Sequence, residues 1–208
     1  MARTWFESYL DRRERRRPDP VVREHRRELL AGLSGRVLEV GCGDGRNFEH
    51  YPSSVSEVVA IEPDAAARAA AELRARSART PVEVLDAAAE AVPAADASFD
   101  AVVVCWVLCT VPNPAATLAE IRRTLRPEGE LRVYEHVRSP HPFFSAFQRL
   151  ADTLGAPRPY GCESTRDTGA ALERAGFDTS SLRRLFHSSS LLTLPTAPHI
   201  FGTATPRS

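Results

Sequence analysis

Short apolar runs alternate with amphipathic segments through the centre of the chain. The apolar runs are rich in β-branched side chains, as is typical of strands buried on both faces of a sheet; they are Val37–Val40, Val58–Ile61, Val82–Leu85, Phe99–Cys105 and Leu131–Tyr134. Between them, the pattern predicts helices that start near Arg46 and that cover Ala65–Arg76 and Ala115–Leu125. Strands that alternate with helices predict an α/β fold with a doubly wound, mostly parallel sheet.

The alternation loosens on both sides of this core. Apolar positions predict one helix before it, Val21–Gly32, and two helices after it, Phe143–Leu154 and Thr165–Ala175. Two later runs, Leu182–Phe186 and Ile200–Ala204, predict closing strands and bring the sheet to seven strands. We therefore expect a single domain over residues 1–208. Its expected parts are an N-terminal helical cap over 1–33, a ligand-binding core over 34–137, and further helices and closing strands over 138–208.

The overall charge of the chain disfavours some classes of binding partner. The chain carries 27 basic and 27 acidic residues, so no overall charge attracts nucleic acid or anionic lipid. A charged run, Asp11–Arg17, is interpreted as a solvated helix face, with contact to a lipid or a nucleic acid as the alternative. The sequence shows neither an apolar leader nor a run near the about 18 residues that span a membrane. We expect a cytoplasmic protein without a stable membrane anchor, a monomer or weak dimer, with a small-molecule substrate and no nucleic-acid partner.

The four cysteines are Cys42, Cys105, Cys109 and Cys162. They form no C-x-x-C pair and no spacing typical of metal ligands, so we interpret them as reduced thiols and expect no metal. No histidine neighbours Cys105 or Cys109 in the sequence, which disfavours a catalytic cysteine at either position. Small side chains there suit close packing against a ligand.

Three glycines, Gly41, Gly43 and Gly45, follow the first core strand at a spacing of two, and Glu39 precedes them within the strand. Glycine adopts positive φ and lets a ligand approach the backbone closely. A carboxylate beside such a loop is unsuited to a pyrophosphate, and suits a cationic ligand with an amino group and a sulfonium. Glu39 can organise the loop or hold the ammonium group. Glu62 follows the next strand, 17 residues after Gly45, where an acid can accept both hydroxyls of a ribose.

Four segments resemble successive motifs of the class I methyltransferases that use S-adenosylmethionine (SAM), namely Glu39–Gly45, Ile61–Pro63, Asp96–Asp100 and Thr124–Gly129. The resemblance implies a Rossmann-like fold, SAM as cofactor and S-adenosylhomocysteine as product. It places the glycine loop, Glu62, Pro63 and Cys105 at the cofactor. Where many relatives have Asp-Ala-Glu at the adenine, the ungapped register gives Ala88-Ala89-Glu90. Either Asp86 supplies the missing acid or backbone groups of Ala88 and Ala89 make the contact, and the ungapped register favours the second.

Further segments, spread over most of the chain, are similar to the methyltransferase-like family of thiol S-methyltransferases. They are Glu24–Leu29, Gly45–Phe48, Tyr51–Pro52, Val104–Cys109, Glu135–Val137, Gly161–Cys162, Thr165–Arg166 and Pro198–Ile200. Animal members carry an apolar membrane-anchoring segment in front, which this sequence does not show. The resemblance favours a thiol as methyl acceptor.

Acceptor chemistry depends on deprotonation, because methyl transfer from a sulfonium needs little else beyond orientation. A thiol of pKa about 8.5 is already partly ionised at neutral pH and needs only a weak base. His136 follows a core strand and is the candidate catalytic residue, unless it only binds loop carbonyls. Tyr9, Trp106 and His199 are candidate substrate contacts, with core or turn roles as alternatives. N- or O-methylation of a metabolite or phospholipid headgroup, and SAM binding without catalysis, remain alternative functions.

Overall fold

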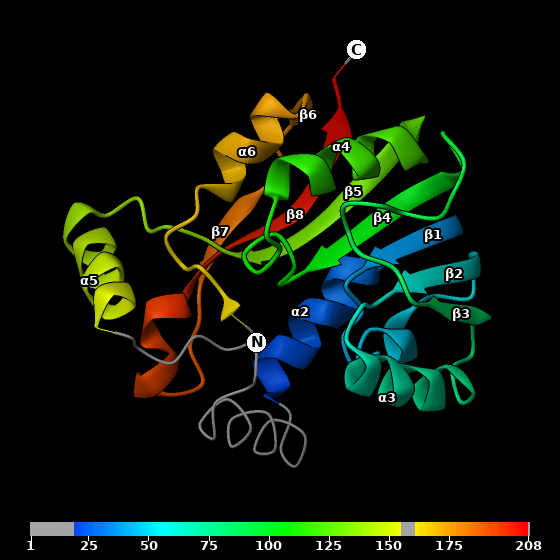
Figure 1. Ribbon diagram of the computed structural model, residues 1–208, viewed down its shortest axis with the longest axis horizontal. Coiled ribbons are helices and arrows are strands. Elements are labelled where there is room, and N and C mark those ends of the chain that lie inside the picture. Colours follow the sequence, from blue (N-terminus) through cyan, green and yellow to red (C-terminus); the bar gives the residue numbers. More distant parts are fainter. Residues whose placement is uncertain (1–18, 155–160, 208) are drawn as a thin grey trace.

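The computed structural model describes residues 19–154 and 161–207, in which helices cover both faces of a central sheet (Figure 1). The sheet has eight strands in the order β3–β2–β1–β4–β5–β8–β6, and β7 pairs with β8 outside this path. The strands are β1 (Gly35–Val40), β2 (Val55–Ile61), β3 (Val82–Leu85), β4 (Phe99–Cys105), β5 (Leu125–His136), β6 (Phe177–Asp178), β7 (Arg183–Phe186) and β8 (Pro198–Pro206). Strands β1 to β5 are parallel to one another, and β8 runs antiparallel to β5. This confirms the predicted Rossmann-like, mostly parallel sheet, with the two-residue β6 as an unpredicted eighth strand.

The helices are α2 (Pro20–Leu30), α3 (Ala65–Ala75), α4 (Pro114–Thr124), α5 (Pro142–Thr153) and α6 (Thr168–Arg174). Successive residues of a strand point to opposite faces. Accordingly, Leu38 of β1 packs in one apolar cluster with side chains of α4 and α6, whereas Val37 packs in a second cluster with side chains of α2 and α3. Both faces of the central strands are therefore buried, which is why these strands appear as mostly apolar runs.

No α-helix starts near Arg46, so that prediction was wrong. The segment between β1 and β2 contains one short 3₁₀ helix, Phe48–His50. Pro52 has no N–H and restricts the residue before it, and Tyr51 is accordingly extended, with φ −64° and ψ 131°. The glycine loop therefore does not lead into a long helix.

The order of the strands places the ends of β1 and β4 side by side, at the point where the connections change direction. Ligands of open α/β sheets bind at this point, beyond the carboxyl ends of the strands. The pairing of β5 with β8 brings a third element to the same end of the sheet, because His136 of β5 lies opposite His199 of β8. Most of the predicted site residues thus lie at one end of the sheet.

Two predictions fall outside the residues that the structure describes, namely the substrate contact at Tyr9 and the charged run over Asp11–Arg17. Within residues 19–154 and 161–207, no helix is both long enough and apolar enough to cross a membrane.

Candidate active site

The three glycines of the loop have different surroundings. All three have positive φ, 64° at Gly41, 58° at Gly43 and 78° at Gly45. A Cβ added at Gly41 would lie 2.8 Å from Val107, and one at Gly45 would lie 2.6 Å from the ring of Phe48. A Cβ at Gly43 would meet no atom of residues 19–154 or 161–207 within 4 Å. Gly41 and Gly45 therefore let the loop pack against the protein, whereas Gly43 faces open space that a ligand can enter.

Glu62 is bonded to this loop. Its carboxylate accepts a hydrogen bond of 2.9 Å from the N–H of Gly43 and another of 2.9 Å from the N–H of Asp64, just before α3. Charged acceptors of this kind make strong hydrogen bonds. The half-buried carboxylate thus lies beside the open space at Gly43, at the end of β2. The adjacent Pro63 is exposed at the same turn.

Glu39 is buried and has partners within the protein. Its two carboxylate oxygens accept hydrogen bonds from Asn47 Nδ2 at 2.9 Å and from the Tyr51 hydroxyl at 2.7 Å. Burial raises the pKa of Glu39 to about 7. Asn47 in turn accepts a bond of 2.7 Å from Arg26 of α2. Of the two roles considered for Glu39, this arrangement favours organisation of the loop.

The candidate adenine contacts lie after β3. Ala88 is exposed, whereas Ala89 is buried in the apolar core. Asp86 pairs with Arg68 at 2.9 Å, and Arg68 also donates to the carbonyl oxygen of Glu62 at 2.8 Å. Asp86 is therefore linked to the Glu62 turn, so both predicted arrangements at the adenine stay open.

Cys105 ends β4, opposite Tyr134 of β5. Burial raises the pKa of its thiol to about 12, which keeps it protonated at neutral pH. The role predicted for Cys105, a small side chain beside the cofactor, suits this environment better than nucleophilic catalysis.

Aromatic rings gather beyond the ends of β4 and β5. Trp106 has a positive φ of 62°, and its ring stacks on His136 with centroids 5.1 Å apart. The rings of His136 and His199 are 4.6 Å apart. The structure thus brings three of the predicted acceptor-side residues together. Trp106 Nε1 and His199 Nε2 are buried without a hydrogen-bond partner among the described residues.

Both histidines are neutral at physiological pH. Burial, with His199 close by, holds the pKa of His136 well below its usual range. Burial lowers the pKa of His199 to about 4. The carbonyl oxygen of Ala197 accepts a bond of 2.7 Å from His199 Nδ1, so Nε2 carries the lone pair and can only accept.

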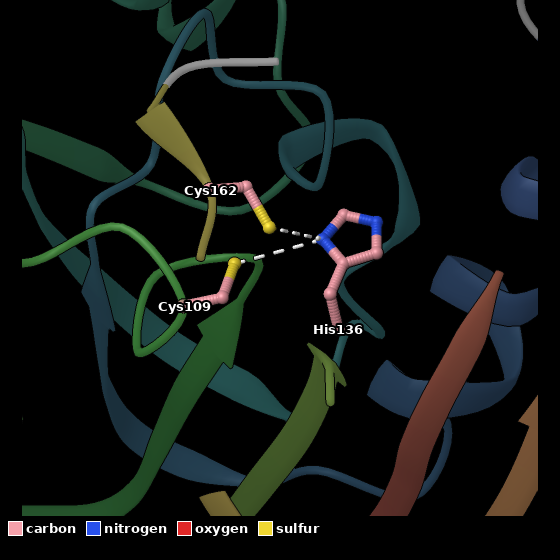
Figure 2. Close-up of side chains that lie close together, drawn as sticks. All are labelled: Cys109, His136 and Cys162. Carbon is pink, nitrogen blue, oxygen red and sulfur yellow. Dashed lines mark hydrogen bonds between the residues drawn. The ribbon is translucent and has the colours of Figure 1, made fainter. Parts of the chain in front are cut away.

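His136 also lies beside two sulfur atoms. Its Nδ1 is 3.6 Å from Cys109 Sγ and 3.4 Å from Cys162 Sγ (Figure 2). The absence of a neighbouring histidine in the sequence was therefore a poor guide to the surroundings of Cys109, because the fold supplies His136.

Glu135 positions the loop after β4, and the sequence did not identify it as a site residue. Its buried carboxylate accepts hydrogen bonds from the N–H groups of Val107, Leu108 and Cys109 at 2.7, 3.0 and 3.2 Å. These bonds hold the turn that carries Trp106 and Cys109. The available signal was an acid directly after the predicted strand Leu131–Tyr134.

Comparison with known proteins identifies the family. The family model described as "Methyltransferase domain" matches residues 38–133. The human thiol S-methyltransferase TMT1B is 35% identical over 187 residues, covering 84% of this chain and 73% of that protein. Human TMT1A is 35% identical over 183 residues with the same coverage.

This chain is a class I SAM-dependent methyltransferase. A solved structure from Thermotoga maritima, described as a SAM-dependent methyltransferase and possible histamine N-methyltransferase, has a TM-score of 0.67, with 22% identity over 98% of each chain. A putative methyltransferase from Bacillus halodurans has a TM-score of 0.67 and 23% identity, over 78% of this chain and 71% of that one. At such identities these two structures support the fold alone.

Membership of this family implies SAM as the cofactor of the methyltransferase. The residues present fit such a ligand, because a side chain at Gly43 would occupy the open space and the Glu62 carboxylate lies at its border. When bound, SAM supplies the electrophilic methyl group. Glu62 would orient the ribose, and the loop backbone would approach the methionine portion.

Proposed function

We propose that the methyltransferase transfers a methyl group from SAM to the thiol sulfur of a small, partly apolar molecule. The relatives named as thiol S-methyltransferases cover 84% of the chain, far more than residues 38–133. Their similarity thus extends beyond the general cofactor-binding part. In this proposal the acceptor thiol binds at the acceptor side, the region where Trp106, His136 and His199 lie together.

The observation that carries the proposal is that the acceptor side offers only weak bases. Its imidazoles are buried and neutral, with lowered pKa values, so they are weak bases. The nearby Glu135 carboxylate is already bonded to three backbone N–H groups. A thiol needs only a weak base or none, whereas an aliphatic alcohol needs a strong one. The site therefore suits a thiol better than an alcohol.

Residue roles follow from this geometry. Glu62 binds the ribose and Gly43 allows the approach of the cofactor, with Ala88 and Ala89 or Asp86 near the adenine. Cys105 leaves room at the end of β4. Trp106 and His199 contact the acceptor, and His136 adjoins the reacting sulfur.

The test is an acceptor screen. Purified protein is incubated with SAM and parallel sets of thiols, phenols and amines of matched carbon skeleton, and both S-adenosylhomocysteine and the methylated product are measured by mass spectrometry. We expect S-methylated products from apolar thiols. Turnover of phenols or amines with no turnover of their thiol counterparts would contradict the proposal.

A further inference from the structure

Three potential metal ligands from separate parts of the chain converge in the interior of the methyltransferase. Cys109 lies in the turn after β4, His136 ends β5, and Cys162 lies between α5 and α6. Figure 2 shows both sulfur atoms directed towards the same ring nitrogen, and the three ligand atoms lie within 4.8 Å of one another. All three side chains are buried. The ligands are separated by 27 and 26 residues, so no short motif reveals them.

The two nitrogen–sulfur distances match those of a tetrahedral zinc site. Bond lengths of about 2.3 Å to sulfur and about 2.05 Å to nitrogen give nitrogen–sulfur edges of about 3.5 Å in a tetrahedron. The observed edges are 3.6 and 3.4 Å. The single lone pair of a neutral Nδ1 accepts one good hydrogen bond, so without a metal only one thiol bonds to it and the other must bond elsewhere, as Cys109 can to Glu135 or to the Cys162 sulfur. A cation at the centre would satisfy all three atoms.

The backbone around the ligands holds them in place. Cys109 is fixed by the bond from its N–H to Glu135, and its carbonyl oxygen accepts a bond of 2.8 Å from the N–H of Glu163. Arg166 donates to the carbonyl oxygens of Leu108 and Val111 at 2.8 and 2.7 Å. The segment that carries Cys162 is thus tied to the turn that carries Cys109. Such support around the ligands is typical of metal sites.

We propose that Cys109, His136 and Cys162 bind one zinc ion through Sγ, Nδ1 and Sγ, and that the fourth position takes the acceptor thiol. The first half of this proposal is independent of the function above, and the second half rests on it. Three protein ligands with one open position are the arrangement of catalytic zinc sites. In this role His136 is a metal ligand rather than a base, and the site departs from the prediction of no metal.

The proposed methyl transfer at the open position accounts for the proton, the electron pair and the leaving group. The acceptor thiol releases its proton to solvent as its sulfur binds zinc. The bound thiolate then forms a bond to the methyl carbon of SAM while the bond from that carbon to the sulfonium breaks. The electron pair of the broken bond stays on the sulfur of S-adenosylhomocysteine, and the methyl thioether leaves.

A second observation points to a ligand beside this position. Trp106 Nε1, which can only donate, and His199 Nε2, which can only accept, are buried without a partner in the described part of the chain. Both rings adjoin the ring of His136. Burying such groups unpaired is costly, so polar groups of a bound acceptor would satisfy them.

The first test measures zinc without any acceptor. The full chain is purified under reducing conditions without a metal-affinity tag, supplied with zinc, freed of excess, and analysed by mass spectrometry of the metal content. We expect about one zinc ion per chain, and less than about a tenth of this in Cys109→Ala, Cys162→Ala and His136→Ala. Cys42→Ala, which removes a buried free cysteine elsewhere, is the control and should retain zinc.

The proposed site would be overturned if folded wild-type protein binds no stoichiometric zinc, whatever the zinc content of the variants. Retention of zinc by the three variants would do the same. His136→Cys supplies another zinc ligand and should restore binding where His136→Ala has lost it, which separates loss of a ligand from loss of folding.

The second test uses cobalt in place of zinc. Tetrahedral cobalt thiolate sites absorb in the visible region, with sulfur-to-metal charge transfer in the near ultraviolet. Addition of an acceptor thiol should intensify the charge transfer, whereas the matching alcohol should not. An unchanged spectrum would overturn the assignment of the fourth position, even if zinc binding and thiol methylation are both observed.

Discussion

The carboxylate of Glu62 accepts a hydrogen bond of 2.9 Å from the backbone N–H of Gly43. This bond joins the ends of β1 and β2 at the open space where SAM is expected. Both residues therefore have a direct role in the proposed cofactor site, and they can be tested separately.

Replacement of Glu62 should weaken SAM binding. Hydrogen bonds to a charged acceptor are worth about 1.5–3 kcal/mol each, and a net loss equal to one such bond in Glu62→Ala should raise the Kd for SAM by about 10- to 200-fold. Isothermal titration calorimetry provides the measurement. Glu83→Ala, at an exposed carboxylate on the neighbouring strand β3, is the control and should bind SAM normally. Equal affinities in the two variants would remove Glu62 from the site.

Replacement of Gly43 should block the cofactor. Gly43→Val places a side chain in open space that SAM needs, and we expect the affinity for SAM to fall by more than about 100-fold. Gly32→Val is the matched control, because Gly32 also has positive φ, 77°, and open surroundings but lies after α2. Both variants should lose about 1–2 kcal/mol of stability from the left-handed conformation, as measured by denaturant unfolding. Similar SAM affinities in both would show that Gly43 does not face the cofactor.

Glu39 should make the stability dependent on pH. Its pKa is about 7 in the folded protein against an ordinary value of 4.5, so the folded state binds the proton more tightly. The contribution of Glu39 to stability is therefore largest below about pH 4.5 and declines as the pH rises to about 7. Glu39→Gln removes this dependence, so its stability relative to wild type should rise by up to about 3 kcal/mol across that window. Urea unfolding at several pH values measures this difference, and a difference that stays constant with pH would contradict the account.

Glu135 should support the acceptor side without contacting SAM. In Glu135→Ala three buried N–H groups lose their acceptor, at a cost of about 3 kcal/mol or more. We expect a lower free energy of unfolding and a raised KM for the acceptor, with the Kd for SAM unchanged in protein that remains folded. Glu135→Gln retains one carbonyl oxygen and should show a smaller loss. If acceptor kinetics are normal in both variants, the loop does not depend on Glu135.

Strand β4 could be predicted closely because it is buried on both faces, and its mostly apolar run has the bounds that the structure shows. The edge strand β3 was also predicted with its observed bounds, although its Glu83 is exposed. The start of β5 was missed by six residues, because Arg126 to Glu130 are mostly polar and include Pro127 and Gly129. The two-residue β6 is too short to leave a pattern.

The two halves of the candidate site differ in how far the sequence predicts them. On the cofactor side, the candidate residues lie at or shortly after the ends of strands, as Gly41 and Glu62 do, so local sequence could propose them, although it left Asp86 and Ala88–Ala89 as alternatives at the adenine. On the acceptor side, the neighbours of His136 come from distant segments, since Cys109, Cys162 and His199 meet only after β5 pairs with β8 and the later loop folds back. No local pattern encodes such a meeting.

The most direct test of thiol methylation uses one acceptor that carries two competing groups. 4-Mercaptophenol carries a thiol and a hydroxyl on one ring, so the same molecule binds whichever group is methylated. After reaction with SAM, the position of the new methyl group is determined by mass spectrometry and NMR, and the reaction without enzyme is subtracted. The account predicts methyl transfer to sulfur, with loss of the product in Gly43→Val. Transfer to oxygen, or no product while SAM binding is intact, would contradict it.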